Sequence, residues 1–409
     1  MVEWLPLLMF AVLLGLIMAG YPVAFTLAGT ALGFAMVGYW WDVFYLTDLG
    51  FIPTRVFGVI NNFTLVAVPL FVFMGLTLEK SGLAEELLKT MGRLFSQGRG
   101  ALAISVVIVG TVLAASTGIV GATVVTMGIL SLPTMISQGY RKSFACGTIA
   151  ASGTLGQIIP PSIVLVLLGD MMNVDVGDLF VAAVAPGLLL VVLYVIYIKA
   201  AAFLWPDVAP LPNAKEEAVP FAEIMGALAP PLALIIVVLG SILFGLASPT
   251  EAAACGATGG LVIAGVKRRL SWQMLAEVSE HTARITAMVF MILVGAQFFG
   301  VVFRGLSGDE MIVQLITELS LHPTVVLLAI MVLLFVLGFF LDFLEICFIV
   351  IPVILPVVNH LGYDTLWLAV LIAINLQTSF LTPPFGFALF YLKGVAPPSV
   401  STQDIYRGI

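Results

Sequence analysis

The chain has 409 residues, of which 61% are hydrophobic and 10% are charged, and its formal net charge is −7. A soluble protein of this length needs a charged surface, so the composition excludes a soluble domain and indicates a polytopic helical membrane protein. The negative charge is spread over loops, which argues against a nucleic-acid partner. The three cysteines lie too far apart for a metal or disulfide framework.

Residues 1–54 are interpreted as an N-terminal membrane segment. The segment is apolar from Leu5 to Gly38 and has no basic region before the apolar run, so we interpret it as retained membrane helix rather than a signal peptide. A single span needs roughly 20 apolar residues. The stretch is therefore either one long kinked helix or two short helices that meet near Tyr21-Pro22, and both alternatives stay open here.

Residues 55–198 are interpreted as the first of two repeats. The apolar stretch 101–136 is flanked by basic loops, which contain Lys80, Lys89, Arg93 and Arg99 before it and Arg141 and Lys142 after it. The positive-inside rule places both loops in the cytoplasm. The stretch must then leave and return to the same face, so we expect a re-entrant hairpin with its tip at residues 115–118. Residues 143–169 follow as a helix broken between Gly153 and Ser162.

A linker and a connecting region separate the repeats. Residues 199–222 are rich in proline and charge and are predicted to be the cytoplasmic linker. Residues 223–283 are predicted to hold connecting helices. The last part of this region, from about residue 271, has mixed polarity and is expected to form an amphipathic helix on the cytoplasmic surface.

Residues 284–409 are interpreted as a second repeat, because four dipeptides recur at one offset of 223 residues. Leu132-Pro133, Gly139-Tyr140, Ile149-Ala150 and Pro160-Pro161 return as Leu355-Pro356, Gly362-Tyr363, Ile372-Ala373 and Pro383-Pro384. The register predicts a hairpin at 324–358 and a broken helix at 366–396. The matching loops are acidic where the first repeat is basic, so the second hairpin should enter from the outside, with its tip at residues 338–342.

Inverted repeats with interrupted helices are how many secondary transporters build a site at mid-membrane. An unwound span is tolerated only inside protein or beside a water-filled cavity, because its backbone groups need partners. The carbonyl groups freed at residues 153–156 and near Thr378 and Thr382 can face a cation, and such hard oxygen ligands suit Na⁺. The positive ends of the half-helices that follow each break favour an anionic substrate group.

Some residues keep two interpretations. A carboxylate inside a membrane costs free energy, so Asp342 is either a cation ligand or a cap of the second hairpin helix. Glu345 either shares the site of Asp342 or pairs with Asp342 on the helix face. Ser116 and Thr117 are either ligands or caps of the first tip. Asn375 and Gln377 either line the site or bond a neighbouring helix.

These segments together resemble the large membrane subunit of tripartite ATP-independent periplasmic (TRAP) transporters over nearly the whole chain. The segments that carry the resemblance are Gly20 to Phe25, Val68 to Gly75, Gly153 to Gly156 with Ile159 to Ser162, Leu337-Gly338 with Leu341-Asp342, and Leu381 to Gly386. Two features depart from the family pattern. The first tip reads Ala-Ser-Thr-Gly at residues 115–118 where many relatives have Ser-Gly-Ser-Ser, and the small subunit is expected to be a separate chain and not fused at the N-terminus.

The resemblance implies an elevator-type fold in the bacterial inner membrane, with Na⁺ entry driving uptake. It implies three partners: a small four-helix membrane subunit, a periplasmic substrate-binding protein and a carboxylate-bearing solute. One Na⁺ site would use Ser116, Thr117, Gly118, Gly153 and Thr154. The other would use Gly338, Asp342, Thr378 and Thr382. The substrate is expected beside the breaks, at Thr154, Pro161, Ser162, Ser379 and Pro384.

The predicted function is therefore Na⁺-coupled secondary uptake of an organic anion, without enzymatic activity. No phosphate-binding loop of the Gly-x-x-x-x-Gly-Lys-Ser/Thr type occurs, so ATP is not the direct energy source. Two alternatives are an ion channel with re-entrant hairpins, which would not need an inverted duplication, and an intramembrane enzyme that uses Asp342. Membrane lipid is the expected environment, and the identity of the solute is not encoded in a readable motif.

Overall fold

The fold is known from a computed structural model that describes residues 4–94, 98–118, 120–210, 220–318, 321–384 and 386–409. Within these ranges the chain is helical and contains no strand. Six of the described helices are long and apolar enough to cross a membrane, or seven if one bent pair counts as a single span. The predicted all-helical polytopic fold is therefore confirmed.

The N-terminal segment consists of two short helices, which decides between the two alternatives left open above. α1 (Leu5–Met18) and α2 (Val23–Trp40) pack against each other, and the chain reverses at Gly20, whose φ is +88°. Glycine adopts this left-handed conformation at little cost. The helices that follow are the 3₁₀ turn η2 (Leu46–Gly50), α3 (Phe51–Ile60), the 3₁₀ turn η3 (Thr64–Val66), α4 (Ala67–Lys80) and α5 (Leu83–Leu94).

The first predicted hairpin and broken helix occur where the sequence placed them. The hairpin consists of α6 (Ala101–Thr117) and α7 (Val120–Ser137). The broken helix consists of α8 (Lys142–Thr154), the 3₁₀ turn η4 (Leu155–Gln157) and α9 (Ile163–Met172). A long helix, α10 (Val176–Leu204), closes the repeat and extends into the predicted linker, of which residues 211–219 lie outside the described part of the chain.

The connecting region differs from the sequence prediction at one point. Its helices are α11 (Phe221–Leu243), α12 (Pro249–Val266) and α13 (Trp272–Gly305), followed by α14 (Gly308–Glu318). The expected surface helix near residues 271–283 is the first part of α13, which continues unbroken for 34 residues. The first glycine in α13 is Gly295 and the helix contains no proline, so nothing in its first six turns interrupts the backbone hydrogen bonds.

The second repeat has the same order as the first, a hairpin followed by a broken helix. Its hairpin consists of α15 (Pro323–Leu337), the single turn α16 (Phe343–Glu345), the π-helical turn η5 (Ile346–Val350) and α17 (Ile351–Leu361). Its broken helix consists of α18 (Thr365–Leu381) and α19 (Phe387–Val395), and the short helix α20 (Thr402–Tyr406) ends the chain. The offset of 223 residues carries Lys142, the first residue of α8, onto Thr365, the first residue of α18. Both double-proline bonds, Pro160-Pro161 and Pro383-Pro384, are cis.

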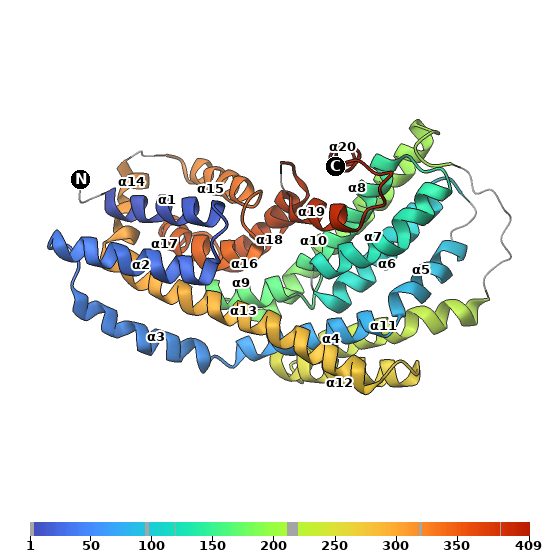
Figure 1. Ribbon diagram of the computed structural model, residues 1–409, viewed down its shortest axis with the longest axis horizontal. Coiled ribbons are helices and arrows are strands. Elements are labelled where there is room, and N and C mark those ends of the chain that lie inside the picture. The colour runs from blue at the N-terminus through green and yellow to red at the C-terminus, as the bar shows by residue number, and fades with distance from the viewer. Residues whose placement is uncertain (1–3, 95–97, 119, 211–219, 319–320, 385) are drawn as a thin grey trace.

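The two repeats run in opposite directions, and helices of each repeat pack against helices of the other. Figure 1 shows the open ends of the two hairpins directed toward opposite ends of the long axis, and the two broken helices running antiparallel. The second helix of each hairpin packs against the second half of the other repeat's broken helix: α7 contacts α19, and α17 contacts α9. This reciprocal packing is what an inverted repeat produces.

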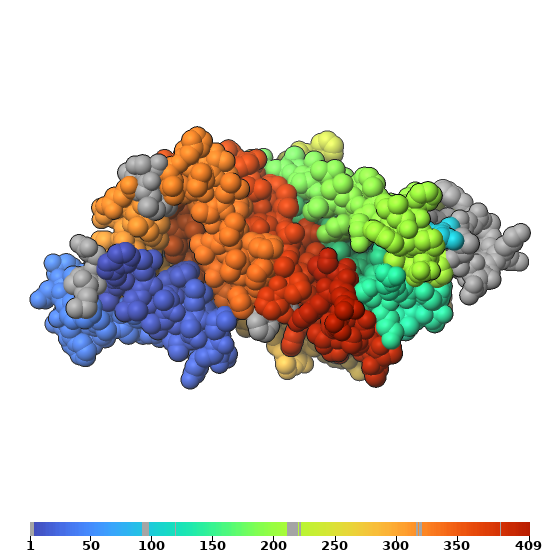
Figure 2. Space-filling model, turned by 90° about the horizontal axis from the view of Figure 1, so that it is seen from above, coloured from blue at the N-terminus to red at the C-terminus, as the bar shows by residue number. Residues whose placement is uncertain are grey.

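A layer of long helices supports the two repeats. α2, α3, α4, α12 and α13 lie along the lower edge of Figure 1, and α13 packs against both α2 and α4. Viewed from above in Figure 2, the C-terminal segment in red lies between α15 in orange and α10 in green. The breaks of α8–α9 and α18–α19 therefore meet inside the protein, where α18 contacts α8, η4 and α9.

Candidate functional site

The tip of the first hairpin is closed by its own hydroxyl groups. Ser116 Oγ donates to the carbonyl oxygen of Val112 at 2.6 Å, and the hydroxyls of Thr117 and Thr123 lie 2.9 Å apart. Gly118 ends α6 in the left-handed conformation with φ +62°, where a side chain would be strained. All three predicted tip residues are thus at the turn, and the hydroxyls of Ser116 and Thr117 make hydrogen bonds within the hairpin.

This tip touches the break of the first broken helix. A Cβ atom on Gly118 would lie 3.4 Å from both the Pro161 carbonyl oxygen and the Ile163 amide nitrogen. A Cβ atom on Gly156 would lie 3.3 Å from the carbonyl oxygen of Ala114, three residues before the end of α6. The predicted pairing of tip and break is therefore present in the structure, and backbone carbonyl groups line the contact.

Gly153 and Thr154 lie in the last turn of α8, directly before the turn η4 that contains Gly156. A Cβ atom on Gly153 would meet Val124 Cγ2 at 2.4 Å, so Gly153 faces α7. Thr154 is fully buried and its Oγ1 donates to the carbonyl oxygen of Ala151 at 3.0 Å. The structure thus brings the five predicted residues of the first cation site into one region, where the hydroxyls bond to protein.

Gln157 is a polar group in this region that the sequence prediction missed. Its side chain is fully buried, and neither Oε1 nor Nε2 has a hydrogen-bond partner in the described part of the chain. Leaving a buried amide unpaired costs about 1–3 kcal/mol, so such groups usually serve a ligand or a function. The signal available in the sequence was a long polar side chain inside the interrupted segment.

The second tip also packs against its broken helix. A Cβ atom on Gly338 would lie 2.1 Å from Ser379 Oγ, so only glycine allows the tip to approach α18 this closely. Ser379 is fully buried and donates to the carbonyl oxygen of Leu376 at 2.8 Å. Beyond the tip, the Phe343 and Phe380 rings lie 6.4 Å apart. The predicted contact between the second hairpin and α18 is therefore present, and it centres on Ser379.

Asp342 caps the helix that follows the second tip. Its carboxylate accepts the Phe343 N–H at 2.7 Å, and its own N–H donates to Glu345 Oε2 at 3.0 Å. The two residues form a capping box, which is the alternative interpretation given above for both of them. A capping carboxylate still has free lone pairs, so this geometry leaves the ligand role open.

The hydroxyls of Thr378 and Thr382 bond to backbone carbonyl groups and not to Asp342. Thr378 Oγ1 donates to the carbonyl oxygen of Ile374 at 2.7 Å, and Thr382 Oγ1 donates to that of Thr378 at 2.9 Å. Thr378 is exposed and Thr382 is half-buried, and no hydrogen bond among the described residues joins either of them to Asp342. Of the four residues predicted for the second cation site, Gly338 therefore contacts α18 at Ser379, which was predicted as a substrate residue, and Asp342 forms a cap.

The expected substrate residues are distributed over the two breaks. Ser162 is buried and donates from Oγ to the carbonyl oxygen of Gln157 at 2.8 Å. The Pro384 carbonyl oxygen accepts the Tyr406 hydroxyl at 2.6 Å, so one break is tied to the C-terminal helix. Tyr391 was not predicted, although its ring lies 3.0–3.3 Å from a Cβ atom built on Gly121, next to the first tip. Tyr391 thus joins α19 to the start of α7.

Asn375 and Gln377 bond neighbouring helices. Asn375 Nδ2 donates to the carbonyl oxygen of Met331 on α15 at 2.8 Å, and Gln377 Nε2 donates to the Tyr194 hydroxyl on α10 at 3.2 Å. Gln377 Oε1 is buried without a partner in the described residues. These amides fasten α18 to both neighbours.

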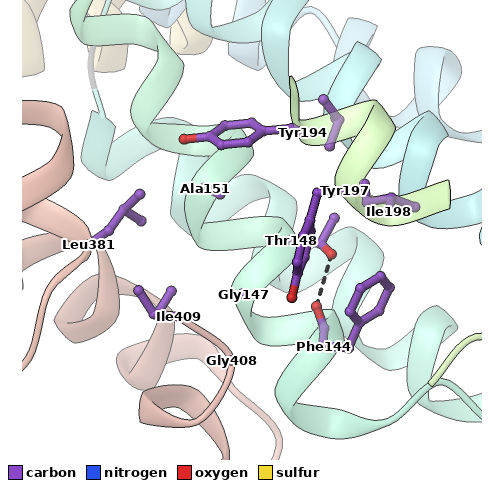
Figure 3. A pocket seen from close by; sticks show the side chains of 11 residues that line it. Phe144, Gly147, Thr148, Ala151, Tyr194, Tyr197, Ile198, Leu381, Gly408 and Ile409 are labelled. Carbon is purple, nitrogen blue, oxygen red and sulfur yellow. Dashed lines mark hydrogen bonds between the residues drawn. The ribbon is translucent and has the colours of Figure 1, made fainter. Parts of the chain in front are cut away.

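A separate cavity lies on the other side of α8 and not between the tips. It holds about 220 Å³ and is bounded by α8, α10 and the C-terminal residues, as Figure 3 shows. Tyr194 and Tyr197 enter it from α10, and Leu381 and Ile409 lie opposite. Ala151 and Thr148 form its floor, and the Thr148 hydroxyl is bonded to the Phe144 carbonyl oxygen at 2.8 Å.

The fold and the paired tips and breaks define a class of protein: a polytopic membrane transporter with two inverted repeats, two hairpins and two broken helices. The profile of the family "Tripartite ATP-independent periplasmic transporter, DctM component" matches residues 10–409. The chain therefore belongs to this family of transporter components and is not an enzyme. It is a multi-pass protein of the bacterial inner membrane.

Curated relatives agree over most of the chain. The C4-dicarboxylate TRAP transporter large permease protein DctM of Pseudomonas aeruginosa is 31% identical over 83% of this chain and 79% of its own length. The sialic acid TRAP transporter large permease protein SiaM of Vibrio cholerae is 30% identical over 97% of this chain and 90% of its own. The isethionate TRAP transporter permease protein DctMQ of Oleidesulfovibrio alaskensis is 30% identical over 93% of this chain but 59% of its own.

A solved structure shares the fold. The YdaH transporter of Alcanivorax borkumensis, described as having an unusual topology, superposes with a TM-score of 0.63 over 89% of this chain and 85% of its own. The two sequences are 17% identical, so the likeness concerns the fold alone.

Proposed function

We propose that this chain carries out Na⁺-coupled uptake of a small organic anion across the bacterial inner membrane. The observation that carries the proposal is the contact of each hairpin tip with a broken helix, at Gly118 beside Pro161 and at Gly338 beside Ser379. Both contacts lie next to interrupted backbone, whose carbonyl groups are suitable ligands for a small hard cation.

Na⁺ is the transported coupling ion in this proposal. The first site would use the tip residues 116–118, the end of α8 and the unpaired Oε1 of Gln157. The second would form when Asp342 and the α18 threonines are brought together, which requires the second tip to move relative to the arrangement described above. Ion binding would thereby order the tips and complete the anion pocket between the breaks.

The anion would lie near the positive ends of two half-helices. α9 begins at Ile163, directly after the first break, and α19 begins at Phe387, directly after the second. The first N–H groups of a helix have no intrahelical partner and attract negative charge. A carboxylate is the favoured substrate group, because relatives are named for C4-dicarboxylates and sialic acid, although one is named for isethionate, a sulfonate.

Two protein partners follow from the family. A tripartite periplasmic transporter has components besides the DctM component, and one relative carries the fused name DctMQ. We assign the other two places to a small four-helix membrane subunit and a periplasmic binding protein that delivers the solute. Transport would proceed by an elevator movement of the hairpins and broken helices against the layer of α2, α3, α4, α12 and α13.

Uptake by proteoliposomes that hold the complete complex tests this function. Labelled dicarboxylates or sialic acid, supplied with the cognate binding protein, should accumulate only under an inward Na⁺ gradient, and the rate should saturate with solute. A gradient-collapsing ionophore should abolish accumulation. Uptake that is unchanged when K⁺ replaces Na⁺ would contradict the proposed Na⁺ coupling. Non-saturable flux that needs no binding protein would indicate a channel instead.

A further inference from the structure

We propose that the groove between α8, α10 and the C-terminal segment binds one anionic phospholipid. Its phosphate would lie at the N-terminus of α8 between Arg141 and Arg407, and one acyl chain would fill the apolar cavity of Figure 3. This inference does not depend on the proposed transport function.

The headgroup end is a pocket of about 220 Å³ at the first turn of α8. Arg141, Ser143, Tyr197, Trp205 and Arg407 are among the residues that line it. Arg141 is the N-cap of α8 and makes no side-chain capping bond, and its own N–H is used by the carbonyl oxygen of Val208 at 3.1 Å. The first N–H groups of α8 are therefore left without a side-chain cap, and a helix N-terminus of this kind binds phosphate.

The charge at this end is positive. Arg141 and Arg407 are exposed and take part in no ion pair within the described residues. Asp404 lies close enough to attract Lys142 and Arg407, but its carboxylate accepts the Ser401 N–H at 2.9 Å and the Ser401 hydroxyl at 2.7 Å. Those bonds hold the pKa of Asp404 below its usual value, so its carboxylate stays ionised and bonded to Ser401. This end therefore carries the cationic side chains of Arg141, Lys142 and Arg407 and the carboxylate side chain of Asp404.

The tail end continues directly from the headgroup end. The two pockets share Phe144, Tyr197 and Gly408. Beyond these residues the lining is mainly apolar and consists of Val107, Gly147, Thr148, Ala151, Tyr194, Ile198, Leu381 and Ile409. A polar entrance with two arginines that leads into an apolar channel matches a molecule with a phosphate at one end and a hydrocarbon chain at the other.

The location favours a lipid over free phosphate. Residues 139–142 and the end of α10 carry the basic loop charges that the positive-inside rule assigns to the cytoplasm. Tyr197 and Trp205 are 58% and 55% exposed, which suits side chains at the level of lipid headgroups. Basic pockets between membrane helices on this face recognise anionic lipid headgroups.

Native mass spectrometry of the purified full-length protein tests the site. We expect phosphatidylglycerol to bind at least about fivefold more tightly than phosphatidylethanolamine, because only the former carries net negative charge. The double substitution Arg141→Gln/Arg407→Gln should weaken phosphatidylglycerol binding roughly tenfold. The matched control Arg268→Gln/Arg269→Gln, at the end of α12, removes the same charge elsewhere and should leave binding unchanged.

Two further measurements separate the sources of phosphate and guard against misfolding. Inorganic phosphate and glycerol 3-phosphate should compete with phosphatidylglycerol at least a hundredfold less well, since they lack the acyl chain. A photoreactive phosphatidylglycerol should label wild-type peptides that cover residues 141–151 or 403–409. Equal binding of the two lipids, unchanged binding in the double variant, competition by phosphate alone, or labelling confined to other peptides would each overturn the proposal.

Discussion

Close approach of backbones at single glycines determines where the tips and breaks meet. A Cβ atom on Gly75 would lie 2.6 Å from the Cα atom of Thr117, so α4 presses directly on the first tip. Gly153 allows α7 to pack against the end of α8, and Gly338 allows the second tip to reach Ser379. Each of these contacts would be prevented by one methyl group, because packed interiors leave no room for it.

Gly153→Ala should destabilise the protein by overpacking. The new methyl group would lie 2.4 Å from Val124 Cγ2 and 3.2 Å from the backbone nitrogen and Cα of Val124. The backbone of Val124 lies within α7 and cannot move freely. The expected cost is about 1–3 kcal/mol, visible as a lower thermal unfolding temperature in detergent. Gly394→Ala is the control, since nothing lies within 4 Å of its Cβ position. Equal unfolding temperatures for the two variants would contradict the packing described here.

Gln157→Leu should raise stability and weaken Na⁺ activation. Leucine fills a similar volume and removes an unpaired amide, whose burial costs about 1–3 kcal/mol. If Gln157 Oε1 serves the ion, the Na⁺ concentration for half-maximal uptake should rise severalfold while the unfolding temperature rises or stays constant. Gln138→Leu, in the exposed turn after α7, is the control. A fall in stability with unchanged Na⁺ dependence would show that Gln157 is a packing residue.

Single residues were predicted unevenly from the sequence. Asp342 and the glycines stood out because a carboxylate or a break is unusual in apolar sequence. Gln157 did not stand out, because its lack of a partner depends on which side chains surround it in three dimensions. Thr378 and Thr382 were expected to face Asp342, but helical residues can bond their hydroxyls to the carbonyl four positions earlier, and here they do.

At the scale of elements, proline and glycine breaks were predicted well and continuous or distorted helices were not. The two double-proline breaks and both tips lie at the expected residues because proline cannot continue a helix hydrogen-bond ladder. The π-helical turn at residues 346–350 has no comparable signature in the sequence. The boundary expected at residue 283 falls inside α13, since mixed polarity does not interrupt a helix that lacks proline and has no glycine before Gly295.

The cap at the second tip gives a prediction that separates structure from ion binding. Asparagine caps a helix about as well as aspartate, whereas alanine loses about 1 kcal/mol. Asp342→Asn should therefore keep the unfolding temperature of the wild type, and Asp342→Ala should lower it. If Asp342 is also an ion ligand, both variants should need at least about tenfold more Na⁺ for uptake. Unchanged Na⁺ dependence in Asp342→Asn would leave Asp342 with the capping role alone.

At the scale of the whole molecule, the duplication explains the packing of the repeats. Each hairpin helix that follows a tip packs against the other repeat's half-helix, so neither repeat completes its interior alone. The offset of 223 residues and the loop charges predicted the inverted duplication, because both are properties of the sequence, but they did not predict which helices of the two repeats pack together. The lateral position of α1, α2 and α10 around the repeats was not predictable, since any apolar helix face can pack against another or against lipid.

Labelling of single cysteines from each side of the membrane tests the central claim that the two hairpins open to opposite faces. The native Cys255 is exposed and would be replaced by serine, whereas Cys146 and Cys347 are buried. In that background, Gln138→Cys reports the open end of the first hairpin and Leu321→Cys that of the second. We predict that a membrane-impermeant maleimide labels Leu321→Cys in intact spheroplasts and Gln138→Cys only in inverted vesicles. Labelling of both positions from the same face would contradict the inverted repeat and the site built upon it.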